Sequence, residues 1–204
     1  MKGLLLKDLY MMKKYCRAYL LIAIIFIAVS FASSENLFFV FYPCLLCGMI
    51  PVNLLGYDER SGWLQYSETL PYTKRQIVSG KYLIGLGTQV AMLLITGIAQ
   101  AIRMSLDGAF ELKGYTVTMM LLLILSLITS SISLPFMFKL GVEKGRTAYY
   151  IMIGVVCAGS IISSSLLQQE ITPNTVLPII CLVGIGIYAL SWYLSIIFYK
   201  KREI

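Results

Sequence analysis

The feature that most constrains this chain is a series of apolar segments, each close to the length that crosses a lipid bilayer. A transmembrane helix needs about 20 mostly apolar residues to span a hydrocarbon core of about 30 Å. Six such segments lie at 15–32, 37–55, 82–102, 115–138, 148–167 and 176–198. Because a bilayer offers no water to backbone groups, these spans must be helices. The sequence therefore predicts an all-α polytopic membrane protein with six transmembrane helices, forming a single transmembrane domain over residues 1–204.

The composition agrees with a lipid environment. Of the 204 residues, 58% are hydrophobic and only 13% are charged, with a mean hydropathy of +0.80. Soluble domains are closer to half apolar and a quarter charged. The net charge of +7 does not indicate nucleic acid, because the basic residues lie between the apolar segments and not along one face. It indicates membrane lipid as the partner and sets the orientation of the spans.

The orientation follows from the positive-inside rule. If both termini are cytoplasmic, all of the 17 basic residues except Arg103 and Lys113 fall on the inner side. The connections on the outer side, 33–36, 103–114 and 168–175, are too short for a folded domain. The first segment has no small-residue cleavage site after Ala28, so we expect it to be retained as a span. These features predict a multi-pass plasma-membrane protein that any folded partner must meet from the cytoplasm or within the membrane.

The first fifteen residues predict an amphipathic helix that lies on the inner leaflet. Its apolar stripe comprises Leu5, Leu9 and Met12. Its other side carries Lys7, Lys13 and Lys14, which we expect to face anionic lipid. Two interpretations remain open: a simple orientation anchor, or a lateral elbow helix that also supports a cytoplasmic partner.

The cytoplasmic loop after the second span predicts a short helix within 57–70 that begins near Asp58. Asp58 and Glu59 suit a helix N-terminus, where the dipole favours carboxylates. Trp63 and Tyr66 are three residues apart and share a face. That face either rests on lipid headgroups or docks on a partner through an aromatic anchor surrounded by charge.

Chemical motifs are missing from the sequence. There is no P-loop, since the segment from Gly141 to Thr147 is one residue too short and has Arg in place of Lys. There is no histidine either, which removes most zinc sites and Ser–His–Asp triads. Cys44 and Cys47 form a CxxC inside an apolar span, where we expect packing and not redox or metal chemistry. We therefore predict a chain that is not an enzyme, with no catalytic residue, metal site or cofactor of its own.

The interior of the spans favours an amphipathic or hydrophobic cargo, if there is one. Ionisable residues are confined to span ends, which argues against a proton- or ion-coupled carrier. Polar residues such as Ser126 and Ser130 predict hydrogen bonds between helices. The candidates for a substrate path are Phe38, Phe41, Tyr42 and Asn53, all in the second span.

Three motifs carry a resemblance to a known family. The chain opens with KGLLLKDL, its second span ends in DERSGW, and SETLPYTKRQIVSGKYL leads into the third span. This order resembles the permease subunits of ABC-2-type transporters. It is most similar to the compact permeases that export phenol-soluble modulins and related amphipathic peptides. Those motifs lie mainly in about thirty residues from Asp58 to Leu83, and the short final external loop leaves little room for the re-entrant helices of larger relatives.

The resemblance implies an exporter subunit, of bacterial origin, that uses ATP hydrolysed elsewhere. ATP and Mg would be bound by a separate ATP-binding-cassette ATPase subunit, and a second permease subunit would complete a dimer, a homodimer in preference to a heterodimer. The coupling helix that docks on the ATPase would present Tyr57, Asp58, Glu59, Arg60, Trp63 and Tyr66. The rival hypothesis is a membrane-embedded assembly or sensor subunit that transports nothing.

Overall fold

The computed structural model describes residues 2–32, 38–106, 108, 111–147, 150–151, 154 and 173–201. Within these ranges every regular element is a helix. The helices are α1 (Lys2–Tyr15), α2 (Arg17–Ala32), α3 (Phe38–Arg60), α4 (Trp63–Glu68), α5 (Lys74–Leu106), α6 (Leu112–Leu140) and α8 (Pro173–Lys201). Residues 142–147 are helical as well. The predicted fold class is therefore confirmed in its coarser form, an all-helical polytopic membrane protein.

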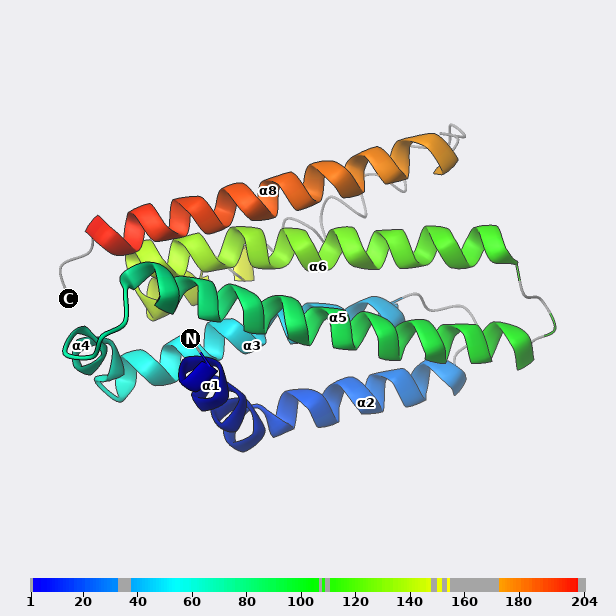
Figure 1. The fold of residues 1–204 in the computed structure, drawn as a ribbon. Coiled ribbons are helices and arrows are strands. Elements are labelled where there is room, and N and C mark those ends of the chain that lie inside the picture. The colour runs from blue at the N-terminus through cyan, green and yellow to red at the C-terminus, as the bar shows by residue number, and fades with distance from the viewer. Residues whose placement is uncertain are drawn as a thin grey trace.

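The long helices form an elongated bundle with two distinct ends (Figure 1). α1 and α4 lie at one end, where α3, α6 and α8 finish and α5 begins; we call this the charged end, for reasons given below. The opposite end, the far end, holds the end of α5 and the start of α6. α3 runs through the middle of the bundle and packs against α2, α5 and α6, while α8 packs on α6 and α5.

Four helices are each long and apolar enough to cross a membrane: Phe39–Arg60, Lys74–Leu106, Leu112–Leu140 and Ile180–Lys201. α1 and α2 pass the same test only as a pair, which is bent by 64°. α2 alone has 16 residues, or about 24 Å of helix. The described residues therefore contain four candidate spans, or five with the bent pair. The predicted fifth span, 148–167, lies almost wholly outside them, so six spans stay a prediction.

The turn between α3 and α5 is built from local signals in the sequence. Gly62 adopts a left-handed conformation (φ 68°) between α3 and α4, which residues with a side chain rarely adopt. The start of α5 is a reciprocal capping box. The Gln76 N–H donates to Thr73 Oγ1 (3.3 Å) and the Thr73 N–H donates to Gln76 Oε1 (3.1 Å). These two devices fix where the chain leaves α3 and where it enters α5.

Polar contacts link α5 to its neighbours inside the bundle. Gln89 Nε2 donates to Ser126 O (2.7 Å) and Ser130 Oγ (2.6 Å) on α6. Tyr82 Oη lies 2.7 Å from the hydroxyls of both Ser191 and Ser195 on α8. The prediction of a hydrogen bond between helices is confirmed for the Ser130 hydroxyl. Ser126 takes part only through its backbone carbonyl, because its hydroxyl donates to Leu123 O within α6.

Candidate docking site at the charged end of the bundle

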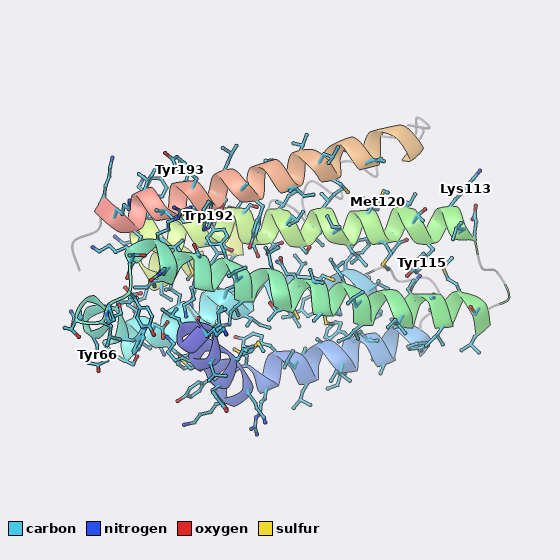
Figure 2. The ribbon with its side chains drawn as sticks, viewed as in Figure 1. Tyr66, Lys113, Tyr115, Met120, Trp192 and Tyr193 are labelled. Atoms are coloured by element: carbon cyan, nitrogen blue, oxygen red, sulfur yellow. The ribbon has the colours of Figure 1, made fainter. Side chains whose placement is uncertain are left out.

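The helix ends and turns that carry the predicted inner-side basic residues come together at one end of the bundle. The two basic residues assigned to the outer side, Arg103 and Lys113, lie at the far end, where Lys113 and Tyr115 are visible in Figure 2. Tyr66 marks the opposite, charged end in the same view. The alternation of the described helices therefore agrees with the predicted asymmetry of charge.

The predicted start of the helix within 57–70 is wrong. Asp58 belongs to the last turns of α3, which continues to Arg60, and α4 starts only at Trp63. The carboxylates do not stabilise the start of the short helix, as their sequence positions suggested. Glu59 instead accepts the Val142 N–H at 2.8 Å, at the start of helix 142–147. The helix dipole favours a carboxylate at this N-terminus, as expected. The helix concerned is the one that starts at Val142, and not the one predicted to start near Asp58.

α4 turns one face toward the bundle and another away from it. Leu64 belongs to the main apolar core, and the buried Ser67 hydroxyl donates to Leu64 O at 2.7 Å. Trp63 is half-buried, whereas Tyr66 is 58% exposed. Their ring centroids lie 5.7 Å apart. α4 is thus anchored from within and presents Tyr66 outward, with the half-buried Trp63 beside it.

The other predicted docking residues have different environments. The ring of Tyr57 stacks on that of Tyr15 from the end of α1, with centroids 4.3 Å apart. Arg60 is exposed, while Asp58 is buried. Of the six residues assigned to the coupling contact, Arg60 and Tyr66 are accessible, and Asp58 serves an internal contact.

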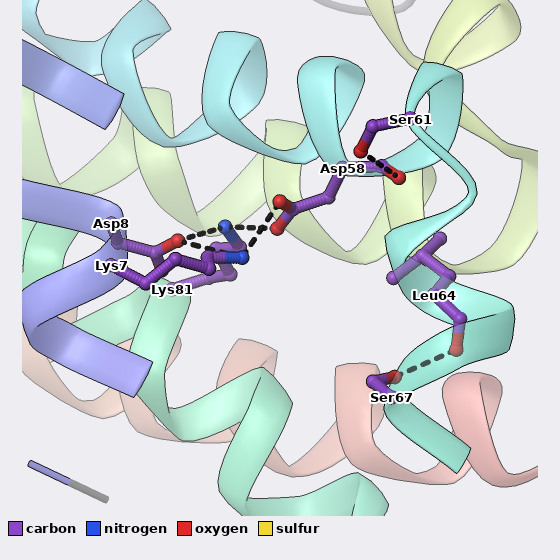
Figure 3. A network of polar contacts seen from close by, with 7 residues as sticks. All are labelled: Lys7, Asp8, Asp58, Ser61, Leu64, Ser67 and Lys81. Carbon is purple, nitrogen blue, oxygen red and sulfur yellow. Dashed lines mark hydrogen bonds and ion pairs between the residues drawn. The ribbon is translucent and has the colours of Figure 1, made fainter. Parts of the chain in front are cut away.

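That internal contact is a closed ring of alternating charges, formed by Lys7, Asp8, Asp58 and Lys81 (Figure 3). Lys7 Nζ lies 2.7 Å from Asp58 Oδ1 and 3.2 Å from Asp8 Oδ1. Lys81 Nζ lies 2.8 Å from Asp8 Oδ1 and 2.6 Å from Asp58 Oδ2. We call these four residues the charged ring. It joins α1, the end of α3 and the start of α5.

The charged ring is almost entirely inaccessible to water. The side chains of Asp8 and Lys81 are fully buried, that of Asp58 is 2% exposed, and only Lys7 reaches the surface, at 23%. Burial of charges is tolerable here because each lysine faces two carboxylates and the set is neutral. The expectation that Lys7 faces anionic lipid is therefore wrong, because its ammonium group is held by carboxylates inside the chain.

A polar cleft of about 380 Å³ separates the end of α3 from the chain that follows α6. Its lining is Gly56, Glu59, Arg60, Leu140, Gly141, Val142, Glu143, Lys144 and Arg146. Arg146 Nη2 donates to Asn53 Oδ1 across one wall at 3.2 Å. The cleft adds charge of both signs to the surface beside α4.

The four candidate path residues do not form one site. Asn53 lies at the charged end with Arg146, twelve residues along α3 from Phe41, which corresponds to about 18 Å. Phe41 packs against an apolar cluster, and the Tyr42 ring stacks on Phe26 with centroids 4.4 Å apart. The side chain of Phe38 lies outside the described residues. The assignment of a path to these residues stays a prediction.

The two thiols of the CxxC lie in the same apolar cluster. Cys44 and Cys47 are each 1% exposed and are free thiols. Among the described residues, no group of three or more His, Cys, Asp or Glu side chains is placed to hold a metal ion. The structure thus shows both cysteines as packing residues.

Comparison with known families decides the identity. The sequence profile described as ABC-2 family transporter protein matches residues 3–200. The chain belongs to the ABC-2 transporter family. No curated protein and no solved structure matches the chain. This ABC-2 protein is accordingly a membrane-embedded component of a transport system, a kind of subunit that generally has no catalytic activity of its own.

Proposed function

We propose that this ABC-2 protein is the permease subunit of an ATP-driven exporter and that its ATPase subunit docks on α4. The observation that carries the proposal is the placement of α4. A short helix that exposes Tyr66, with the half-buried Trp63 beside it, is fixed at the end of the bundle where the basic residues gather. Exposed aromatic anchors bordered by charge are typical of docking hot spots. The neighbouring Arg60 and the polar cleft supply that border.

The proposed mechanism follows from the connections of α4. Only Ser61 and Gly62 separate it from α3, and the short stretch 69–73 separates it from α5. A push on α4 when the ATPase closes is therefore transmitted to two membrane-crossing helices within a few residues. The tilt of these helices, with that of the first span, would expel the cargo in a dimer of permease subunits, most simply two identical chains.

The proposed cargo is an amphipathic or hydrophobic molecule, and a peptide by the similarity to modulin exporters. Supporting this, the ionisable residues of the described spans lie near helix ends, so the middle of the bundle offers apolar and neutral polar surface. Moving ions or protons normally requires charged groups near the midplane. ATP and Mg would act only in the partner subunit.

We further propose that the charged end faces the cytoplasm of a bacterial cell, with both termini inside. In a background without native cysteines, Ser61→Cys and Lys113→Cys place one thiol at each end of the bundle. A membrane-impermeant maleimide applied to intact cells should label position 113 and spare position 61. Labelling of position 61 alone would reverse the topology and exclude cytoplasmic docking on α4.

We expect the reading frame next to this chain to encode a Walker-motif ATPase, and the docking experiment uses that protein as its probe. The chain alone should hydrolyse no ATP, whereas the reconstituted pair should. Tyr66→Ala should weaken co-purification, since truncation of an aromatic hot spot costs about 2–4 kcal/mol of binding free energy. Trp63→Ala should do the same, and Arg60→Ala should have a smaller, salt-sensitive effect.

A matched control is Tyr10→Ala, which removes a tyrosine that is 67% exposed, against 58% for Tyr66, from α1 at the same end. It should leave ATPase binding unchanged. Equal binding by the Tyr66, Trp63 and control variants would refute docking on α4. If the ATPase binds but its turnover is insensitive to the permease, the chain is an assembly or sensor subunit instead.

A further inference from the structure

The four residues of the charged ring come from three separate segments of the chain. α1 contributes Lys7 and Asp8, α3 contributes Asp58 and α5 contributes Lys81. Each lysine contacts both carboxylates, so the ring closes on itself without a gap (Figure 3). We infer that the charged ring is a positioning device, which holds α4 in one place relative to the elbow helix α1 and the span α5.

Stability alone does not account for such a ring. Buried ion pairs give little net stabilisation compared with apolar residues of the same volume, because removing the charges from water offsets their attraction. What four alternating charges do impose is geometry, since any slip of one helix separates opposite charges and brings like charges together. A ring of this kind therefore specifies one register of three segments.

Two contacts extend the ring to α4. Asp58 precedes the turn into α4, and the Ser61 hydroxyl donates back to Asp58 O at 3.2 Å. From the other side, Lys7 Nζ lies 4.3 Å from the centroid of the Trp63 ring, within the range of a cation–π contact. The charged ring thus contacts α4 in two ways. One is the backbone that connects Asp58 to α4, and the other is the side chain of Trp63, the first aromatic residue of the proposed docking face.

Close packing next to the ring supports the same role. A Cβ atom at Gly80, the neighbour of Lys81, would lie 3.1 Å from Leu4 Cδ2 of α1. The missing side chain lets α1 cross α5 closely enough for Asp8 to reach Lys81. Leu4 and Leu64 belong to the same buried cluster, so apolar packing brings the segments together and the charges fix their alignment.

Two matched double substitutions separate positioning from stability. Lys7→Met with Asp58→Asn leaves the Asp8–Lys81 pair, which keeps α1 on α5 but releases the end of α3. Asp8→Asn with Lys81→Met leaves the Lys7–Asp58 pair, which keeps α1 on α3 and releases α5. Each variant removes one cation and one anion and remains neutral at the ring.

Spin labels measure the position of α4 directly in the full-length chain in nanodiscs. Cysteines at the exposed positions Tyr10 (α1) and Tyr66 (α4) carry one pair of labels, in a background without native cysteines. A control pair at Leu106 and Leu112 reports on the far end, where both side chains are exposed. Double electron–electron resonance then gives a distance distribution for each pair.

The parent chain should give a single narrow distribution for the 10–66 pair. Lys7→Met/Asp58→Asn should shift or broaden it, whereas Asp8→Asn/Lys81→Met should leave it narrow, and neither should change the 106–112 pair. A purely stabilising role predicts equal effects of the two variants on the 10–66 distances. Equal effects, or none, would overturn the inference. Should the first variant fail to fold, Lys7→Gln alone tests the same contact at the partly exposed corner of the ring.

The consequence for docking rests on the proposed function and is measured separately. If the released α4 occupies its docking position only about a tenth of the time, the apparent Kd for the ATPase rises about tenfold. A broadened 10–66 distribution with no ATPase binding by any chain, the parent included, would refute docking and leave the positioning role intact. A tenfold weaker ATPase complex with unchanged distances would refute positioning and leave docking intact.

Discussion

The two ends of this bundle are held together in different ways. At the charged end, the segments are fixed by directional contacts: the charged ring, the Glu59–Val142 hydrogen bond and the Arg146–Asn53 hydrogen bond. Among the described residues of the far end, α5 and α6 pack through apolar side chains such as Met92 and Leu122, and the Tyr115 hydroxyl donates to Gly97 O at 3.3 Å. Directional contacts specify a geometry, whereas apolar contacts in lipid tolerate sliding. Substitutions should therefore act strongly at one end and weakly at the other.

The largest difference between the ends is expected from removal of one ring charge. Asp58→Asn leaves Lys7 and Lys81 with a single carboxylate, and an uncompensated buried charge costs about 3–5 kcal/mol. Lys113→Gln removes an exposed charge at the far end and should change stability by less than about 0.5 kcal/mol. Thermal stability followed by fluorescence-detected size exclusion compares the two variants directly. Similar melting temperatures for both would mean that the ring contributes nothing to the folded state.

The next largest effect concerns close packing beside the cleft. A Cβ atom at Gly145 would overlap Met137 Cγ and lie 3.0 Å from Met137 Cα. Gly145→Ala should therefore destabilise the chain by about 1–3 kcal/mol through overpacking. A Cβ atom at Gly186 on α8 would meet no neighbouring group of the described residues within 4 Å, so Gly186→Ala is the matched control. It should be neutral or slightly stabilising, since alanine favours helix. Destabilisation of equal size at both positions, measured by the same thermal assay, would point to a general cost of alanine and not to contact with Met137.

The sequence predicted much of the far end and the spans, because these depend on local hydropathy. The apolar runs located α3, α5, α6 and α8 to within several residues of their observed ends, apart from extensions of α5 beyond the predicted 82–102. That extension begins at the capping box of Thr73 and Gln76. The T-x-x-Q pattern was present in the sequence and would have placed the start of α5 correctly.

The charged ring could not be predicted in the same way. Lys7 and Asp58 are 51 positions apart, and Asp8 and Lys81 are 73 apart. Helical spacing makes Lys7 look like a lipid-facing residue, and dipole preference makes Asp58 look like the start of a helix. Both arguments use only the neighbouring sequence. In the structure, a tertiary contact between distant segments determines where both side chains lie. The one available signal was Lys81 itself, a charge at the edge of an apolar run and beside a glycine.

A smaller effect is expected in the middle of the bundle. Gln89→Leu removes the hydrogen bonds from α5 to Ser126 O and Ser130 Oγ, and such contacts between membrane helices contribute about 0.6–1.7 kcal/mol. Ser126→Ala is the matched control, because the Ser126 hydroxyl donates within its own helix, to Leu123 O at 2.8 Å. Denaturation of the chain in mixed micelles should show a larger loss for Gln89→Leu. The reverse order would mean that Gln89 does not link α5 to α6.

The smallest effect is expected on the outer face of α5 toward the far end. Ile98 is 61% exposed, so in a bilayer its side chain contacts lipid tails. When it is truncated to alanine, lipid tails fill the space that it leaves. Lipid tails are as apolar as the side chain, and surface truncations usually change stability by less than about 0.5 kcal/mol. Ile98→Ala should therefore have the same free energy of unfolding as the parent chain when both are denatured in mixed micelles. A loss above about 2 kcal/mol, the range for truncating a packed aliphatic side chain, would mean that this face is covered by protein. If the loss depended on chain concentration, a second copy would be the protein that covers it, and the far end would then be specified by assembly instead of by its own contacts.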